Sequence, residues 1–160
     1  MPEDDTLLRA VEDLGAQLPP YLAALVLEVR HDDERALADQ VRAVVDAALP
    51  PGVGLPFDGA PALHRSTPET CCRLLHIVLA KDLAYDAPRP SYDYDHDSVE
   101  AAFSAVATAV GPSAGWWMNR RDLLEEGYPG WTPLLWTTMD AAIVVRGAGS
   151  IVVWAIGDED

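Results

Sequence analysis

The chain has 160 residues, of which 49% are hydrophobic and 23% are charged. A chain of this length can bury a real core, and its apolar content excludes intrinsic disorder. Its 26 acidic and 11 basic side chains give a formal net charge of −15. This charge disfavours binding to nucleic acid and to anionic membranes, and it would attract a basic protein partner instead.

The chain begins with MPEDDTLL, which is acidic where a secretory signal would be basic. The longest apolar run, YLAALVL, is too short to span a bilayer. The only two cysteines, Cys71 and Cys72, are neighbours and would point about 100° apart on a helix, which disfavours an ordinary disulfide between them. Together these features predict a cytoplasmic protein with reduced thiols.

Three segments of the first third predict helices. Residues 4–18 place apolar side chains on one helical face, and residues 32–49 show the same spacing most clearly. Residues 21–30, YLAALVLEVR, are apolar nearly all round and fit a buried helix or a strand. Because Ala and Leu outnumber the β-branched residues there, we favour the helix. The two amphipathic stripes are formed by Leu7, Val11, Leu14 and Leu18 and by Leu37, Val41, Val44 and Ala48.

The middle of the chain predicts two further helices. Residues 66–83 begin with Thr67 as the N-cap and Pro68 at the first helical position. Residues 98–110 follow, with Asp97 or Ser98 as the cap and Val99, Phe103, Val106 and Val110 on one face. A short helix is expected to begin near Asn119. The buried stripe of the first of these helices is expected to contain Cys71, Leu75, Val78 and Leu79.

Strands are predicted after residue 130, where β-branched and aromatic residues dominate. The segments are 134–139, 141–146 and 150–156, and the glycines of 147–149 supply a hairpin turn. The last two strands are apolar on both faces, so both faces must be covered or paired with another chain. We therefore expect one α+β domain over residues 1–160, with five or six helices packed on a small C-terminal antiparallel β-sheet, either a hairpin or a three-stranded meander.

The stretch SYDYDHDSVE, residues 91–100, places aspartates at alternate positions, as in a calcium loop. An EF-hand counted from Asp93 needs Gly at position 6 and Glu at position 12, but Ser98 and Ser104 stand there. We therefore predict no metal site and no cofactor. Tyrosines between exposed carboxylates suit a protein interface, because rings supply contact area and acids meet arginines. The predicted partner-binding residues are Tyr92, Asp93, Tyr94, Asp95 and Trp117.

Two constellations allow an enzyme as an alternative. Cys72 and His76 are four residues apart and share a helical face, as a nucleophile and its base would. Zinc would need further ligands, and the other histidines have no Cys or His at motif spacing. The second constellation is Asp93, Asp95 and His96 in the acidic loop. Phosphate-binding, serine-hydrolase and metalloprotease motifs are absent from the sequence.

The closing strand pair, DAAIVVRGAGSIVVWAIGDED, resembles the termini of small acidic bacterial immunity proteins. The resemblance implies a protein that binds and neutralises a cognate toxin, but it covers only residues 140–160 and transfers no residue role. We therefore expect a non-enzymatic cytoplasmic protein that binds a basic protein partner, with a toxin inhibitor as one version. The alternatives are an unfamiliar enzyme and a structural protein that self-associates, as a homodimer, through its C-terminal strands.

Overall fold

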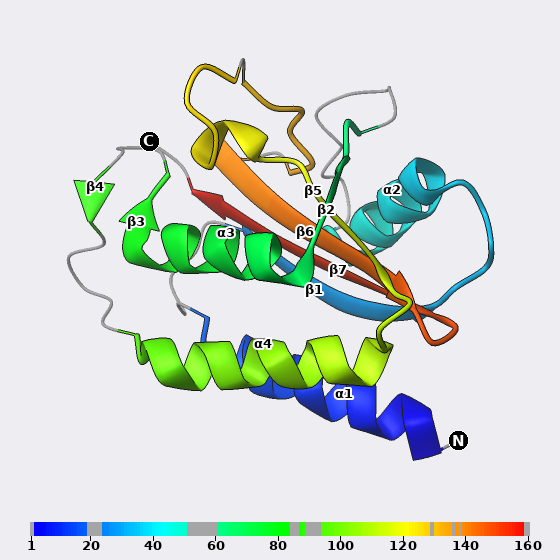
Figure 1. The fold of residues 1–160 in the computed structure, drawn as a ribbon. Helices are drawn as coiled ribbons and strands as arrows, with labels where there is room; N and C mark the ends of the chain where they lie inside the picture. The colour runs from blue at the N-terminus through cyan, green and yellow to red at the C-terminus, as the bar shows by residue number, and fades with distance from the viewer. Residues whose placement is uncertain are drawn as a thin grey trace.

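The computed structural model consists of an antiparallel sheet with helices on both faces (Figure 1). It describes residues 2–18, 24–50, 61–83, 87–88, 94–128, 130–135, 137 and 139–158. All structural statements below refer to these residues.

Four α-helices lie within the described ranges. They are α1 (Pro2–Gly15), α2 (Leu37–Ala48), α3 (Pro68–Ala80) and α4 (His96–Val110). Each falls on a helix expected from the sequence, and the Thr67 side chain caps α3 as predicted, by accepting a hydrogen bond from the backbone N–H of Thr70. The expectation of five or six helices was wrong. Residues 24–31 form a strand, and the segment after Asn119 contains only a 3₁₀ turn, η1 (Arg121–Leu123).

The main sheet has five antiparallel strands in the order β1-β7-β6-β5-β2. They are β1 (Ala24–His31), β2 (His64–Ser66), β5 (Gly115–Met118), β6 (Met139–Gly147) and β7 (Ser150–Asp158). A separate two-stranded pair joins β3 (Lys81–Asp82) to β4 (Ala87–Pro88). The expectation of a small C-terminal hairpin or meander was therefore wrong, because β1 extends the hairpin on one side and β5, followed by β2, extends it on the other.

The strand β1 explains the misread segment 21–30. It pairs with β7 over its whole length, from Ala24 opposite Gly157 to His31 opposite Ser150. Its apolar side chains alternate between the two sides of the sheet. A strand whose two faces are both covered needs apolar residues on both, and this explains why the segment shows no polar face. Pairing with β7 outweighs the helix preference of Ala and Leu.

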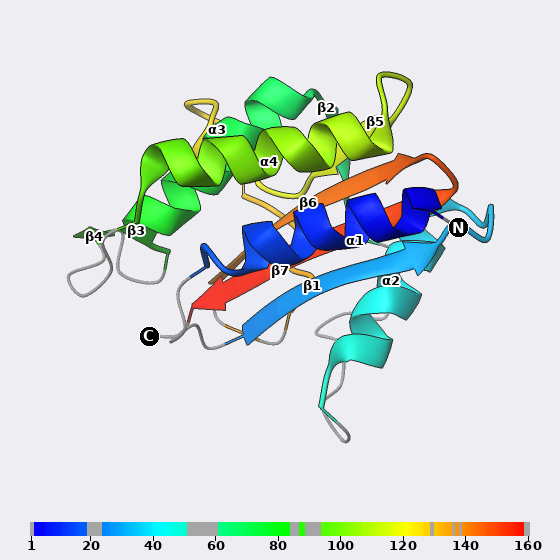
Figure 2. The ribbon, with the colours of Figure 1, turned by 90° about the horizontal axis from the view of Figure 1, so that it is seen from below.

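The two faces of the β6–β7 hairpin belong to different cores, as the sequence alternation predicts. Ile143 and Val145 pack with α1, α3 and α4, whereas Val144 packs with α2. Figure 2 shows α1 and α4 side by side on one face and α2 on the other. Leu134 and Leu135, expected in a strand, lie instead in a loop and fill the second core beside α2.

The hairpin turn is formed by Ala148 and Gly149, both with positive φ (52° and 75°), as a two-residue type I′ turn requires. Both outer edges of the hairpin are occupied within the chain, by β1 on β7 and by β5 on β6. A homodimer formed by strand pairing would consequently have to use other strands.

A buried carboxylate, Asp140, fixes the loop that covers the second core. Its Oδ1 accepts hydrogen bonds from Asn119 Nδ2 (3.1 Å) and Trp131 Nε1 (3.0 Å). Its Oδ2 accepts from the backbone N–H groups of Leu134 (2.5 Å) and Leu135 (2.6 Å). Burial raises the pKa of Asp140, and these four donors act in the opposite direction. The carboxylate thereby ties β5, β6 and the 131–135 loop together.

Replacing Asp140 with Asn should lower the free energy of unfolding by about 3 kcal/mol or more. The substitution replaces one carboxylate oxygen, which accepts hydrogen bonds, with an NH₂ group that would face N–H donors. Urea denaturation monitored by circular dichroism measures this change. The control is Asp46→Asn, an exposed carboxylate on α2 that should change stability by less than about 0.5 kcal/mol. Equal stability of the two variants would contradict the structural role of Asp140.

Candidate functional site

Two helices bring ionisable side chains together at the end of the molecule where α4 begins. Cys72 and His76 lie one turn apart on α3, and His96 and Glu100 lie one turn apart on α4. Tyr94 lies just before α4. We call Cys72, His76, Tyr94, His96 and Glu100 the histidine cluster. The site joins residues from two separate predictions, the Cys72–His76 pair and the acidic loop.

His76 lies at the centre of the histidine cluster. Its ring stacks on that of His96, with 3.8 Å between the ring centroids and 6° between the planes. Its Nδ1 lies 3.3 Å from the Tyr94 hydroxyl, and its Nε2 is buried with no hydrogen-bond partner in the described part of the chain. Burial, and secondly the neighbouring His96, lower the pKa of His76, whereas Glu100 acts to raise it. The imidazole is therefore neutral at neutral pH.

Potential metal ligands converge at this cluster. One ligand atom from each of Cys72, His76 and Glu100 lies within 4.8 Å of the other two. A second group, formed by His96, Asp97 and Glu100, meets the same limit. The two groups share Glu100, whose side chain is 56% exposed. The cluster thus combines nitrogen, sulfur and oxygen donors in a position that solvent reaches.

Both thiols are free, and both are poor nucleophiles. Burial raises the pKa of Cys71 to about 12 and the pKa of Cys72 to about 11. Cys71 is fully buried and belongs to the predicted stripe of α3, whereas Cys72 is half-buried beside α4. A thiol attacks as its thiolate, so this environment does not activate Cys72 as a nucleophile.

The predicted partner-binding residues separate into three groups. Tyr92 and Asp93 lie outside the described residues, so the part of the enzyme alternative that depends on Asp93 is not tested. Tyr94 is half-buried in the histidine cluster, and the exposed Asp95 lies beside it. Trp117 is distant from both, since it lies on β5 and packs against the second core, with the Arg65 guanidinium carbon 4.7 Å from its ring centroid.

Asp95 is the N-cap of α4. Its Oδ1 accepts hydrogen bonds from the backbone N–H groups of Asp97 (3.1 Å) and Ser98 (3.2 Å). These hydrogen bonds lower the pKa of Asp95. The cap expected at Asp97 or Ser98 therefore lies two or three residues earlier, and one of the three alternating aspartates starts the helix.

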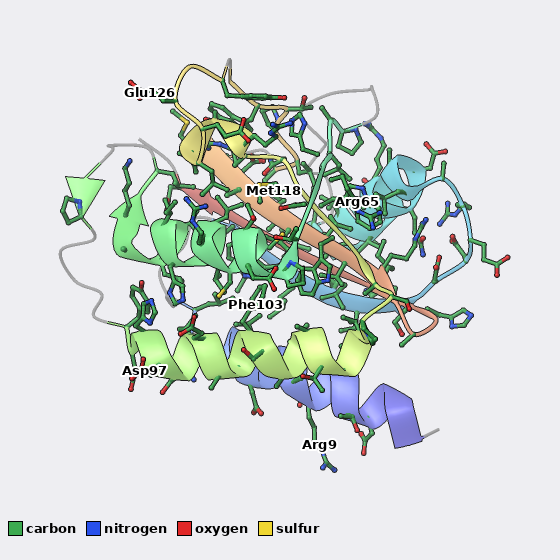
Figure 3. The ribbon with its side chains drawn as sticks, in the orientation of Figure 1. Arg9, Arg65, Asp97, Phe103, Met118 and Glu126 are labelled. Carbon is green, nitrogen blue, oxygen red and sulfur yellow. The ribbon has the colours of Figure 1, made fainter. Side chains whose placement is uncertain are left out.

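Carboxylates from α1 and α4 collect at the same end of the helical layer. Because the two helices run antiparallel, the end of α1 lies beside the first half of α4 (Figures 1 and 2). Figure 3 shows Asp97 at the beginning of α4, and its side chain is fully exposed. We call this region the acidic surface. It consists of Glu12, Asp13, Asp95, Asp97 and Glu100.

No arginine or lysine forms an ion pair with the acidic surface in the described ranges. Six arginines pair with other carboxylates, and His96 is the one basic side chain near Asp97 (3.8 Å) and Glu100 (3.9 Å). The six pairs are Arg9–Asp5, Arg30–Glu28, Arg35–Asp33, Arg120–Asp122, Arg121–Glu125 and Arg146–Asp32. The negative charge of the acidic surface is thus left largely uncompensated.

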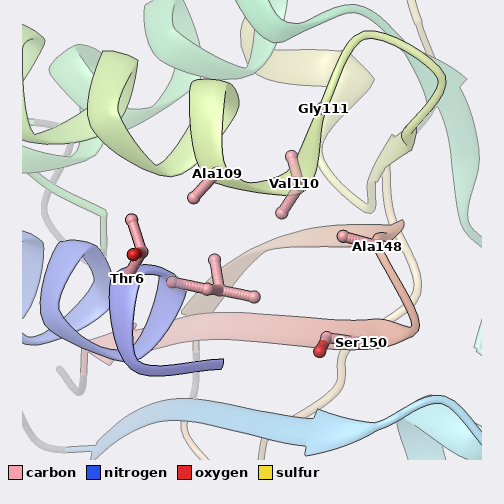
Figure 4. A pocket seen from close by; sticks show the side chains of 7 residues that line it. Thr6, Ala109, Val110, Gly111, Ala148 and Ser150 are labelled. Atoms are coloured by element: carbon pink, nitrogen blue, oxygen red, sulfur yellow. The ribbon is translucent and has the colours of Figure 1, made fainter. Parts of the chain in front are cut away.

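Two pockets lie away from the histidine cluster. One, of about 340 Å³, is lined by Arg65, Arg73 and Arg121 together with hydroxyl groups near the start of α3, and Glu125, which pairs with Arg121, lines it as well. The other, of about 280 Å³, lies between α1, the end of α4 and the hairpin turn (Figure 4). Thr6, Leu7, Val110 and Ser150 are among its lining residues, none of which is ionisable at neutral pH.

No family model matches the chain, and neither the curated proteins nor the solved structures include a significant match. Among the described helices, none combines the length and the apolar character needed to cross a lipid bilayer. The geometry of the site is therefore the basis for the functional argument.

Cys72 should react slowly with iodoacetamide at neutral pH. A pKa of about 11 in place of 9.0 leaves about 100-fold less thiolate than in an unperturbed cysteine. Peptide mass spectrometry after timed alkylation measures the two thiols separately, with Cys71 expected to be slower still. Alkylation of Cys72 as fast as that of free cysteine would contradict the raised pKa of this thiol and would support the enzyme alternative.

The lowered pKa of His76 should make the folded protein less stable in mild acid. In the unfolded chain His76 takes up a proton near the ordinary histidine pKa of 6.5, and in the folded chain only at lower pH. The unfolded state then binds more protons in this window, so the free energy of unfolding falls as the pH drops from 6.5 through the lowered pKa.

Urea denaturation over this pH range tests the assignment. His76→Gln should flatten the pH dependence of stability, whereas His31→Gln, at an exposed site on β1, should leave it unchanged. The same slope in wild type and His76→Gln would show that His76 is not the group responsible.

Proposed function

We propose that this protein is a non-enzymatic, cytoplasmic binding protein that holds a basic protein partner on the acidic surface. Inhibition of a toxin, as by an immunity protein, is one concrete version of this role. The observation that carries the proposal is that the five carboxylates of the acidic surface lack arginine and lysine partners within the described structure, whereas six arginines elsewhere are paired.

The long-range field supports the same partner. A net charge of −15 produces a negative potential over the whole molecule, which speeds the encounter with a cationic protein and repels nucleic acid. Carboxylates without an ion pair inside their own chain can form ion pairs across an interface without breaking an existing one. The acidic surface therefore offers a basic partner several such carboxylates at one end of the described helical layer.

Aromatic contact area lies next to these charges. Tyr94 is half-buried with its hydroxyl near His76, and the His76–His96 stack adjoins it. Rings held in place by neighbours contribute area to an interface at a small entropic cost. Tyr94 and Asp95 therefore keep their place in the proposed interface, together with Asp97, Glu12 and Asp13.

The chemistry of the thiols favours binding over catalysis. The raised pKa values of Cys71 and Cys72 weaken the thiol–imidazole mechanism that the sequence allowed. Free thiols also fit the proposed reducing cytoplasm. Many proteins that cleave nucleic acids are basic, so a toxin of that class would suit the charge of this chain.

Affinity capture from a native lysate with paired charge variants tests the proposal. Asp13→Asn/Asp97→Asn removes two charges from the acidic surface. Asp39→Asn/Asp46→Asn removes two exposed charges from α2, on the opposite side of the sheet, and so matches the change in net charge. Captured proteins are identified by mass spectrometry, and the affinity of a basic candidate is then measured at low and at high salt.

The α1–α4 variant should bind the partner at least about fivefold more weakly than wild type, and the α2 variant should bind within about twofold. Wild-type affinity should fall as salt rises. Equal loss in both variants would assign the effect to net charge rather than to this surface. An affinity that is independent of salt, or capture of no basic protein, would overturn the proposed function.

A further inference from the structure

We infer that Cys72, His76 and Glu100 form a binding site for a divalent transition-metal ion of the zinc class. The side chains come from two helices and offer a thiolate, an imidazole and a carboxylate, the three ligand types that zinc takes in proteins. The site shares Glu100 with the acidic surface, but its test needs only the isolated chain and no protein partner.

The separation of the donors is close to what the ion needs. Zinc lies about 2.0 to 2.3 Å from its ligand atoms, so the ligand atoms of a tetrahedral site are about 3.3 to 3.8 Å apart. The donors of Cys72, His76 and Glu100 already lie within 4.8 Å of one another. Because the side chain of Glu100 is exposed, it is free to rotate toward Cys72 and His76 and shorten the remaining distance.

The environment of His76 supports ligation. Its Nδ1 is engaged by the Tyr94 hydroxyl, whereas its buried Nε2 has no hydrogen-bond partner among the described residues. A buried, unpartnered nitrogen is costly, and a metal ion supplies the missing partner. Metal-ligating histidines commonly donate their other ring N–H to a polar partner, and the Tyr94 hydroxyl is placed to accept from Nδ1 of His76.

The charges around the site favour a cation. Glu100 and Asp97 are negative, and the described part of the chain places no arginine or lysine in an ion pair with either. Ligation converts the Cys72 thiol to a thiolate and releases one proton to solvent, so the ion binds more tightly as pH rises.

Three protein ligands leave one position of a tetrahedral ion for water. His96 stacks on His76 at 3.8 Å with nearly parallel planes, so in this arrangement one ion cannot lie in the plane of both rings. The stacking contact with His96 therefore holds the His76 ring in position. It does not serve as the fourth ligand.

The test uses the purified apo protein, Zn²⁺ and Co²⁺. Zn²⁺ should bind with 1:1 stoichiometry in a chelator-competition titration and should raise Tm. Co²⁺ should give a near-ultraviolet charge-transfer band that reports a thiolate ligand. Cys72→Ser should abolish this band, and Glu100→Gln should weaken Zn²⁺ binding at least about tenfold.

Cys71→Ala is the matched control. Its thiol is buried, with Sγ 4.0 Å from the carbonyl oxygen of Trp117, and the band should persist without it. Glu100→Gln alters an exposed side chain, so its folding should be normal by circular dichroism even if Cys72→Ser is less stable. Absence of 1:1 binding by wild type, a band that survives Cys72→Ser, or full Zn²⁺ affinity in Glu100→Gln would each overturn the site.

Separate variants distinguish failure of the metal site from failure of the partner-binding surface. Asp13→Asn/Asp97→Asn should keep its Zn²⁺ affinity within about threefold, because neither side chain is a ligand. Cys72→Ser should keep its affinity for a basic partner. Loss of Zn²⁺ binding in the charge variant would contradict the ligand set, whereas loss of partner binding alone would leave the metal site intact.

Discussion

The arrangement of this molecule depends on a hairpin that is apolar on both faces. The strands β6 and β7 are almost entirely buried, so every alternate side chain on each of them needs a covering layer. One layer cannot satisfy both faces. The chain therefore places α1, α3 and α4 on one side and α2 with the 131–135 loop on the other, and it extends the hairpin with strands from its first half.

This constraint also generates the candidate site. Because α3 and α4 must share one face of the sheet, their buried stripes fix how each helix is rotated. The residues beside those stripes, Cys72 and His76 on α3 and His96 and Glu100 on α4, then face one another at the edge of the core. The antiparallel packing of α1 adds its carboxylates at the same end. The side chains of the proposed metal site and the carboxylates of the acidic surface thus lie together because of apolar packing elsewhere.

The sequence predicted what depends on local pattern. Alternation assigned Ile143 and Val144 to opposite faces, and Thr67 with Pro68 located the start of α3. It failed where pairing between distant segments decides the structure, since β1, residues 24–31, is a strand because it pairs with β7. Likewise, no spacing rule joins the Cys72–His76 pair to Glu100, because a second helix supplies the missing ligand.

Packing of α3 and α4 on a doubly covered sheet brings the ring of His76 onto that of His96. Nuclear Overhauser spectroscopy on the labelled protein tests it directly. Stacked rings with centroids 3.8 Å apart predict strong cross-peaks between the two imidazoles, and weaker ones from Tyr94 to His76. Sheet contacts from both α3 and α4, without any cross-peak between these histidines, would contradict the account.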